Sequence, residues 1–135
     1  MSRILVVDDD KALATALSAR LRAAGYEVFA AYGADSASKL VLQKRPDLVI
    51  LDIEMPHYSG LEFHECLRIS PRAGNIPVIY LSGQDSATYR TEAFRNGARA
   101  YVSKPYDSKK LIALIEEILH PAGAPETPAL QPMAN

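Results

Sequence analysis

The chain has 135 residues, a length that fits one domain with a sizeable core and needs no second domain. Its hydrophobic fraction of 48%, charged fraction of 23% and formal net charge of -1 are those of a soluble globular protein, and they argue against nucleic-acid binding by this chain alone. Because it has no apolar run of about 20 residues, no signal-peptide pattern and only one cysteine, Cys66, we expect a cytoplasmic protein without membrane spans or disulfides.

The N-terminal half alternates between short apolar runs and segments with helical periodicity. The short runs favour strands, and Gly25 and Pro46 stand where the two helical segments should end. In chain order, these patterns predict a strand over Ile4–Val7, a helix over Lys11–Ala24, a strand over Tyr26–Ala31, a helix over Ala34–Arg45 and a strand over Leu48–Leu51. Asp10 is interpreted as the N-terminal cap of the first helix rather than as a ligand.

The C-terminal half continues this alternation. Phe63, Cys66 and Leu67 predict the inner side of a third helix, which leaves His64 on the surface. The later predicted elements are a strand over Pro77–Leu81, a helix over Ala87–Asn96, a strand over Ala100–Val102 and a last helix capped by Asp107. Strands that are apolar throughout and alternate with helices predict a parallel sheet covered on both faces.

Polar side chains follow the predicted strands where each strand ends. The first strand ends at Asp8 and Asp9, the third at Asp52, the fourth at Ser82 and the fifth at Lys104. A single aspartate in such a place is more often a cap than a reactive group. However, the carboxyl ends of parallel strands share one edge of the sheet, so we expect all five side chains to meet there.

Three acids, a hydroxyl and a lysine at one edge support a narrow range of chemistry. Clustered carboxylates repel each other, and a set of oxygen ligands without His or Cys favours Mg²⁺ or a similar hard cation. A carboxylate that the metal leaves partly free can act as a nucleophile on phosphorus, and Asp52 is the natural acceptor. Lys104 and Ser82 would then neutralise and bind the transferred group.

Four segments resemble the receiver domains of bacterial two-component response regulators. They are ILVVDDD at 4–10, PDLVILDIEMPHYSG at 46–60, PVIYLSG at 77–83 and GARAYVSKPY at 97–106. The resemblance covers about residues 1–120, which would form the receiver domain. It implies a flavodoxin-like α/β fold in a single domain, with a doubly wound five-stranded parallel sheet of order 2-1-3-4-5 and five helices. From Pro121 the sequence is rich in proline, which predicts a disordered tail or linker over 121–135.

The resemblance also implies a magnesium site and a phosphoacceptor. Asp9 would ligate Mg²⁺ directly, and Asp8 would help through the water shell of the metal. Asp52 would be both phosphoacceptor and ligand, and the backbone carbonyl of Glu54 would be a further ligand. The phosphoryl group would come from the phosphohistidine of a sensor histidine kinase or of a histidine phosphotransfer protein.

The remaining roles implied by the resemblance concern the response to phosphorylation. Ser82 would bind one phosphoryl oxygen and Lys104 would pair with another. Tyr101 would be an aromatic switch that turns inward as Ser82 moves, and the Lys104–Pro105 peptide bond would be cis. Two positions depart from the family pattern. Ala100 stands where an acid is common, and Glu54 carries a carboxylate that we expect to alter the access of water to the aspartyl-phosphate.

The function expected from these residues is two-component signal transduction. The chain would catalyse only its own phosphorylation and dephosphorylation, and it would be either a stand-alone receiver or the receiver portion of a longer regulator with an output domain or a downstream protein target. A homodimer would form through the last two helices and the last strand, where basic residues gather: Arg90, Arg95, Arg99, Lys109 and Lys110. The alternatives are a Mg²⁺-dependent phosphatase or phosphotransferase that uses an aspartyl-phosphate, and a flavodoxin-like electron carrier, which the acidic loop after the first strand disfavours.

Overall fold

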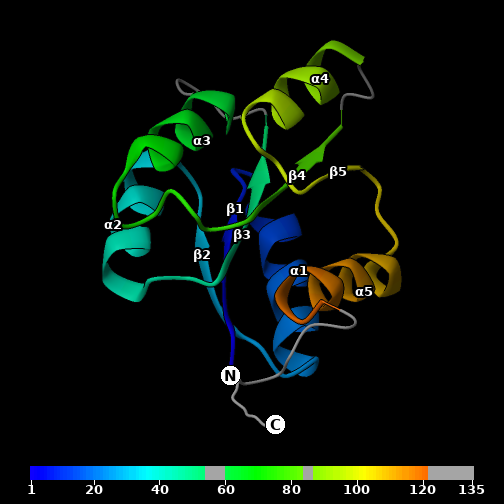
Figure 1. The fold of residues 1–135 in the computed structure, drawn as a ribbon. Coiled ribbons are helices and arrows are strands. Elements are labelled where there is room, and N and C mark those ends of the chain that lie inside the picture. The colour runs from blue at the N-terminus through cyan, green and yellow to red at the C-terminus, as the bar shows by residue number, and fades with distance from the viewer. Residues whose placement is uncertain (54–59, 84–86, 122–135) are drawn as a thin grey trace, which may run out of the picture.

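The computed structural model describes residues 1–53, 60–83 and 87–121, in which strands and helices alternate (Figure 1). The strands are β1 (Arg3–Val7), β2 (Glu27–Ala31), β3 (Leu48–Asp52), β4 (Val78–Ser82) and β5 (Ala100–Ser103). The helices are α1 (Lys11–Ala23), α2 (Ala34–Lys44), α3 (Gly60–Ile69), α4 (Ala87–Arg95) and α5 (Ser108–Leu119). All ten predicted elements are therefore confirmed.

The five strands form one parallel sheet in the order β2-β1-β3-β4-β5, as predicted. The register pairs Val7 of β1 with Leu51 of β3, and Leu81 of β4 with Asp52 of β3. Ser82 of β4 in turn lies opposite Ser103 of β5. The carboxyl ends of the four adjacent strands β1, β3, β4 and β5 therefore lie along the same edge of the sheet.

Helices cover both faces of the sheet (Figure 1). Helices α1 and α5 lie on one face, and α2, α3 and α4 lie on the other. Successive strand residues point to opposite faces of the sheet. Leu5 and Val7 therefore pack on the face covered by α2, α3 and α4, while Ile4 and Val6 pack on the face covered by α1 and α5. All five residues of β3 are buried, because β3 is the central strand with helices on both sides. Burying a large aliphatic side chain contributes about 1.5–3 kcal/mol to the stability of the fold. The packing on both faces of the sheet therefore fixes the position of the sheet edge that carries the acids.

The predicted helix ends are confirmed at several positions. The Asp10 carboxylate accepts a hydrogen bond from the backbone N–H of Leu13 at 3.1 Å, as expected of an N-terminal cap. The Asp107 carboxylate caps α5 in the same way, by accepting from the N–H groups of Lys109 and Lys110. Gly25 follows α1 with φ of 101°, the left-handed conformation that favours glycine.

The buried face of α3 differs from the prediction. The residues of α3 that face the core are Gly60, Phe63, His64 and Leu67. The inward positions of Phe63 and Leu67 are confirmed, but His64 is only 4% exposed and Cys66 is exposed, so the predictions for these two residues were wrong. A stripe through His64 and one through Cys66 have the same helical spacing, and the lower polarity of cysteine favours the wrong one.

No helix in the described part of the chain is both long and apolar enough to cross a membrane. The tail predicted for 121–135 lies outside the described residues, except for Pro121. Glu54 also lies outside them, so its predicted roles stay predictions.

Candidate functional site

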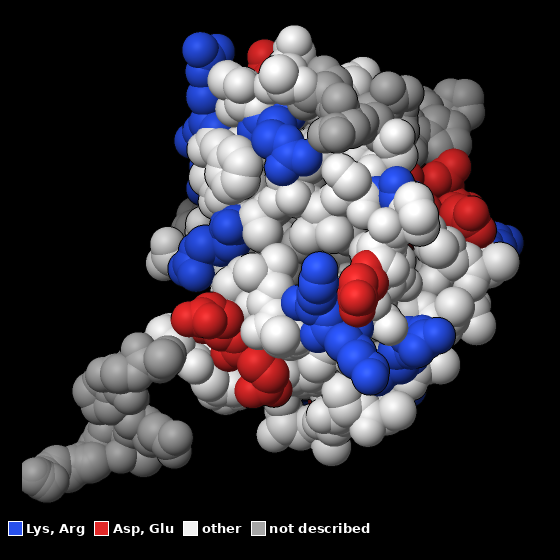
Figure 2. Space-filling model, turned by 90° about the vertical axis from the view of Figure 1, so that its right-hand side faces the viewer, with Lys and Arg blue, Asp and Glu red and all other residues white. Residues whose placement is uncertain are grey.

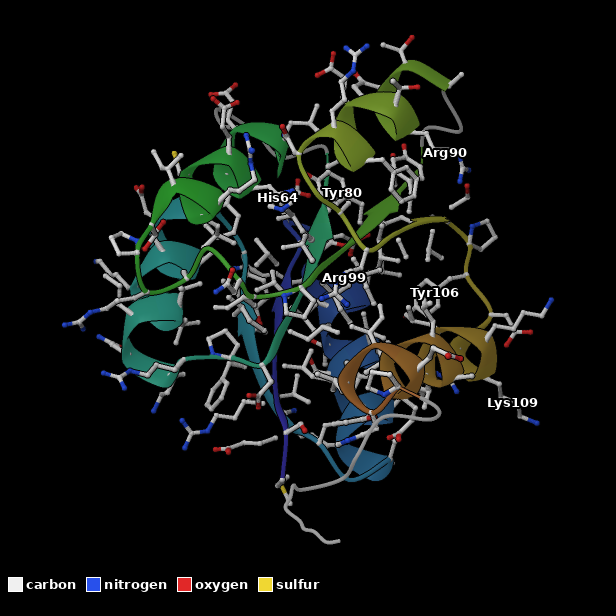
Figure 3. All side chains as sticks on the ribbon, viewed as in Figure 1. His64, Tyr80, Arg90, Arg99, Tyr106 and Lys109 are labelled. Atoms are coloured by element: carbon white, nitrogen blue, oxygen red, sulfur yellow. The ribbon has the colours of Figure 1, made fainter. Side chains whose placement is uncertain are left out.

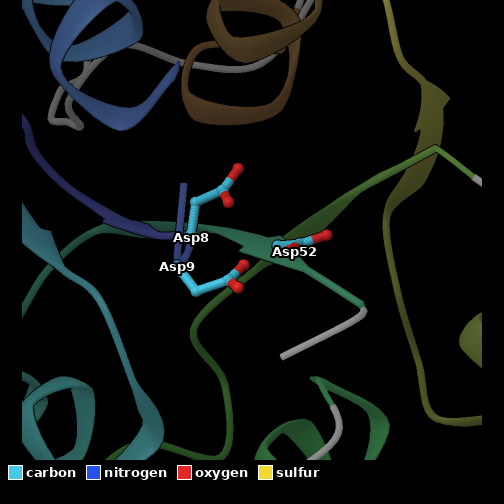
Figure 4. Close-up of side chains that lie close together, drawn as sticks. All are labelled: Asp8, Asp9 and Asp52. Carbon is cyan, nitrogen blue, oxygen red and sulfur yellow. The ribbon is translucent and has the colours of Figure 1, made fainter. Parts of the chain in front are cut away.

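Three aspartates meet at the carboxyl edge of the sheet (Figure 4). Asp8 and Asp9 directly follow β1, and Asp52 is the last residue of β3. One carboxylate oxygen from each of the three lies within 4.8 Å of the other two. Asp8 and Asp52 are buried at 3% and 4% exposure, whereas Asp9 is exposed. The predicted convergence of the acids is therefore confirmed.

Local hydrogen bonds fix the turn that carries the first two acids. The backbone N–H of Asp8 donates to the carbonyl of Ala31 at 3.0 Å, which extends the β1–β2 pairing to the strand end. The Asp8 carboxylate accepts from the N–H of Asp10 at 3.0 Å, and Asp10 begins α1 as its cap. Strand, turn and helix therefore constrain Asp8 together.

Lys104 contributes the positive charge of the site. Its Nζ lies 3.1 Å from Oδ2 of Asp8 and 3.5 Å from Oδ1 of Asp52. Burial by itself lowers the pKa of Lys104, but the hydrogen bond with Asp8 and the charge of Asp52 outweigh it, and the pKa is raised above its usual value. Lys104 is therefore charged at neutral pH, and it bridges two carboxylates that would otherwise repel each other.

The backbone around Lys104 ties it to β4. The N–H of Lys104 donates to the carbonyl of Ser82 at 2.7 Å, and the Lys104–Pro105 peptide bond is cis, as the resemblance implied. Ser82 is fully buried and ends β4, the strand next to Asp52. The structure therefore brings Asp8, Asp9, Asp52 and Lys104 into one cluster, with Ser82 at the end of the neighbouring strand.

The donor set suits a hard divalent cation. All three converging groups are carboxylates, and no described histidine or cysteine joins them. Carboxylate oxygens are the ligands that Mg²⁺ and Ca²⁺ prefer, whereas the softer transition metals favour imidazole or thiolate. Three negative charges that share one lysine also leave a net negative site, which a cation would neutralise.

Residues 4–116 match the family model of the response regulator receiver domain. The chain belongs to this family. It is 34% identical to the DNA-binding dual master transcriptional regulator RpaA of Synechocystis over 119 residues, which are 88% of this chain and 49% of RpaA. The receiver thus spans about half the length of the curated relatives it matches.

Solved structures of the same family share the fold of this receiver. The chemotaxis protein CheY4 of Vibrio cholerae superposes with a TM-score of 0.84 at 28% identity, covering 88% of this chain and 99% of CheY4. A CheY-like receiver domain protein of Methanospirillum hungatei gives a TM-score of 0.81 at 30% identity, covering 88% of this chain and 94% of that one. The likeness extends over the whole sheet and its helices.

Gly60 of the receiver allows α3 to begin close to the end of β3. A Cβ atom on Gly60 would lie 2.4 Å from the backbone oxygen of Asp52 and 2.7 Å from Cα of Ile53. The N–H of Gly60 donates to the carbonyl of Ile53 at 2.9 Å, which holds this close approach. Only a residue without a side chain fits here, because the backbone atoms at the end of β3 cannot move aside without a large cost in energy.

We expect Gly60→Ala to destabilise the receiver by about 1–3 kcal/mol, because the new methyl group must displace the end of β3. The unfolding midpoint in urea measures this loss. Gly33→Ala is the matched control: a Cβ on Gly33 meets no atom within 4 Å, so this variant should lose only the smaller amount expected for alanine at the N-cap of α2. Equal midpoints for the two variants would contradict the close approach.

Tyr101 of the receiver lies inside the protein. It is 7% exposed, and its ring stacks on that of Tyr80, with the ring centroids 6.3 Å apart. The guanidinium carbon of Arg90 in α4 lies 4.7 Å from the centroid of the Tyr101 ring. The predicted turning motion of Tyr101 stays a prediction, but its ring has defined neighbours on β4 and α4.

His64 and Tyr80 form a buried polar pair that the sequence patterns did not predict (Figure 3). Nδ1 of His64 lies 2.8 Å from the hydroxyl oxygen of Tyr80, which is fully buried. Burial, with a smaller contribution from the charge of Arg68, lowers the pKa of His64 to about 4. A buried tyrosine hydroxyl needs a hydrogen-bond partner. A tyrosine in the middle of an apolar strand was therefore a signal that some polar residue had to face inward, but it did not indicate from which element.

We expect His64 to make the receiver sensitive to mild acid. An unfolded chain binds a proton on histidine below about pH 6.5, whereas folded His64 stays neutral down to about pH 4. Its contribution to stability is thus full above pH 6.5 and is lost as the pH falls toward 4. The loss between pH 7.5 and 4.5 should be about 2–3 kcal/mol. Urea unfolding of wild type and His64→Gln over this range measures it, and parallel pH profiles would contradict it.

Proposed function

We propose that this receiver is a phosphorylation-controlled binding module of two-component signal transduction, with Asp52 as its phosphoacceptor. The convergence of Asp52 with Asp8, Asp9 and Lys104 at one edge of the sheet carries this proposal. Asp52 is the acceptor rather than Asp8, because Asp52 sits on the central strand between the exposed acid Asp9 and the ends of β4 and β5. Lys104 lies near both carboxylates, at 3.1 Å from Asp8 and 3.5 Å from Asp52, but Asp8 also accepts from the N–H of Asp10 in the turn that leads into α1.

Mg²⁺ is the cation that we propose for the carboxylate cluster. Asp9 would ligate it directly, Asp8 would act through its water shell, and Asp52 and the carbonyl of Glu54 would complete the protein ligands. When bound, the ion would supply positive charge that offsets the carboxylates and the phosphoryl oxygens. The fit of three carboxylate oxygens within 4.8 Å of one another supports this assignment.

The chemistry that we propose for the chain's own residues is phosphoryl transfer to a carboxylate. One oxygen of Asp52 attacks phosphorus, the P–N bond of the donor phosphohistidine breaks, and the imidazole leaves with a proton. The ammonium of Lys104 then pairs with one phosphoryl oxygen, and the Ser82 hydroxyl donates to another. Hydrolysis by water regenerates the Asp52 carboxylate, so the receiver catalyses only these two steps on itself.

The partners that we propose follow from this chemistry. A sensor histidine kinase or a histidine phosphotransfer protein supplies the phosphoryl group, which places the receiver in the cytoplasm. RpaA is described as a DNA-binding transcriptional regulator, and this chain matches about half of it. We therefore propose that residues 1–120 form the receiver domain and that 121–135 form a tail or linker, either of a stand-alone receiver or of a longer regulator with an output domain. Nothing in the charge balance suggests direct nucleic-acid binding by this chain itself.

A homodimer contact is proposed at the face formed by α4, β5 and α5. Arg95, Arg99, Lys109 and Lys110 are exposed there. Figure 2 shows Lys and Arg side chains at several places on this face, with Asp and Glu side chains between them. A surface with both charges can pair with a second copy of itself, whereas a surface of one sign would repel its copy.

The two alternative functions have less support. An aspartyl-phosphate phosphatase would need a general acid near the acceptor, and the candidate for this role is Glu54, two residues beyond Asp52. An electron carrier would need amide and hydroxyl donors after β1 to bind a flavin phosphate, but Asp8 and Asp9 lie there. Family membership and the acidic edge both favour the receiver function.

Incubation with Mg²⁺ and acetyl phosphate tests the proposal. We expect intact mass spectrometry to show one phosphoryl adduct on the wild-type chain, and peptide mapping to place it on Asp52. Removing divalent cations with EDTA should abolish adduct formation, because the carboxylates would then repel the phosphodonor. The absence of any adduct, or an adduct that forms equally well in EDTA, would overturn the proposed mechanism.

A further inference from the structure

The contacts around Tyr101 connect β4, β5 and α4. Tyr80 and Tyr101 lie opposite each other in the β4–β5 register, and their rings stack at an interplanar angle of 23°. Arg90 of α4 lies over the Tyr101 ring and also approaches its carbonyl, with Nη1 at 3.5 Å. The Tyr101 ring thus has Tyr80 and Arg90 as neighbours.

Tyr80 is itself held on its far side. Its hydroxyl meets Nδ1 of His64 in α3 at 2.8 Å, and the two rings contact edge to face at 5.4 Å between centroids. Asn96, just after α4, also hydrogen-bonds the Tyr80 hydroxyl and reaches the carbonyl of Leu61 at 3.4 Å. Burial raises the pKa of the Tyr80 hydroxyl, against smaller opposite effects of Asn96 and Arg68. The phenol therefore stays neutral and keeps these bonds at any physiological pH.

Tyr80 is also connected to the acidic edge through its own strand. Ser82 lies two residues further along β4, so both side chains point to the same face of the sheet. A side chain that is fully buried, stacked on one side and hydrogen-bonded on the other has few alternative rotamers. The ring of Tyr80 therefore forms a fixed wall against which the ring of Tyr101 rests.

We propose that Tyr80, anchored by His64, is a positioning residue that holds Tyr101 inside the receiver. The inward placement of Tyr101 is then set by the core of this chain rather than by modification of Asp52, and this proposal replaces the turning motion of Tyr101 that the family resemblance implied. This inference rests on the proposed function, in which Asp52 is phosphorylated. It means that the α4–β5 surface around Tyr101 is the same before and after phosphorylation. The change produced by phosphorylation must then be carried elsewhere on the surface.

Fluorine NMR of the chain labelled with 3-fluorotyrosine tests the proposal. The chain has seven tyrosines and no tryptophan, and a Tyr101→Phe variant assigns the signal of Tyr101. The shift of this signal between H₂O and D₂O measures exposure. We expect a small isotope shift for Tyr101 in wild type, and in Tyr80→Leu a shift as large as that of Tyr32, which is 41% exposed.

Two milder variants separate positioning from general stability. Tyr80→Phe and His64→Leu each remove the same hydrogen bond, so both should raise the Tyr101 isotope shift equally, and the double variant should raise it no further. Tyr26→Phe is the matched control. It removes a buried tyrosine hydroxyl bonded to Glu116 on the opposite face of the sheet, and it should lower stability without moving the Tyr101 signal.

The outcomes are distinct. An unchanged Tyr101 signal in folded Tyr80→Leu overturns the proposal, and if that variant does not fold, unchanged signals in Tyr80→Phe and His64→Leu overturn it. A Tyr101 signal that is exposed in wild type and becomes buried only with Mg²⁺ and acetyl phosphate also overturns it. Intact mass records the phosphoryl adduct on the same samples, so a missing adduct counts against the proposed function while the NMR result on Tyr101 still stands.

Discussion

Asp52→Asn is expected to abolish the phosphoryl adduct completely and to leave the fold intact. Asparagine has the shape of aspartate, but its neutral amide is a poor nucleophile toward phosphorus. Stability should stay equal or rise, since the substitution removes one of three carboxylates that lie within 4.8 Å of one another. Intact mass after incubation with Mg²⁺ and acetyl phosphate measures the adduct, and urea unfolding measures the stability.

Asp10→Asn is the matched control for Asp52→Asn. Asp10 belongs to the same acidic run, but its carboxylate caps α1 by accepting from the N–H of Leu13. Asparagine caps helices as well as aspartate does, so this variant should take up the phosphoryl group like wild type. An Asp52→Asn chain that still forms the adduct at the wild-type rate would show that another residue is the acceptor.

Replacing Lys104 with methionine should affect both stability and phosphorylation. The ammonium of Lys104 lies 3.1 Å from Asp8 and 3.5 Å from Asp52, and both carboxylates are buried. Methionine leaves these charges uncompensated, for which we expect a loss of about 3 kcal/mol at pH 7 in the absence of divalent cations. Adduct formation should fall by about 100-fold, because one cationic partner of the phosphoryl oxygens is missing.

Adding Mg²⁺ shows whether the loss of stability in Lys104→Met comes from uncompensated charge or from poorer packing. A cation bound by Asp8, Asp9 and Asp52 would neutralise the charges that Lys104 neutralises in wild type. Added Mg²⁺ should therefore raise the melting temperature of Lys104→Met more than that of wild type. Lys39→Met, which removes an exposed lysine of α2 away from the proposed dimer face, should match wild type in every measurement. A Lys104→Met chain as stable as Lys39→Met would refute the bridging role of Lys104.

The raised pKa of Lys104 predicts the direction of its pH dependence. A lysine in an unfolded chain loses its proton near pH 10.4, whereas folded Lys104 holds its proton to a higher pH. Its contribution to stability is thus full below pH 10.4 and is lost as the pH rises through the folded pKa. Acid and alkali therefore destabilise the receiver through different residues, His64 at low pH and Lys104 at high pH.

The sequence by itself determined the sheet and the group of residues at its edge. Five apolar runs that alternate with helical segments allow few arrangements other than a covered parallel sheet. In such a sheet the strand ends share one edge, so Asp8, Asp9, Asp52 and Lys104 could be brought together by topology alone. Asp10 and Asp107 were recognisable as caps because capping depends on bonds to residues two or three positions away.

Only the tertiary structure decided which side of α3 faces the core and what holds Tyr101. Stripes through His64 and through Cys66 fit the helical period equally well, and the buried Tyr80 hydroxyl selects His64 as its partner from another element. The stack of Tyr80, Tyr101 and Arg90 likewise joins β4, β5 and α4. Periodicity and capping act within a few residues of chain, whereas the pairing of buried polar groups depends on which elements meet in space. The rotation of a helix about its axis is set by those distant partners.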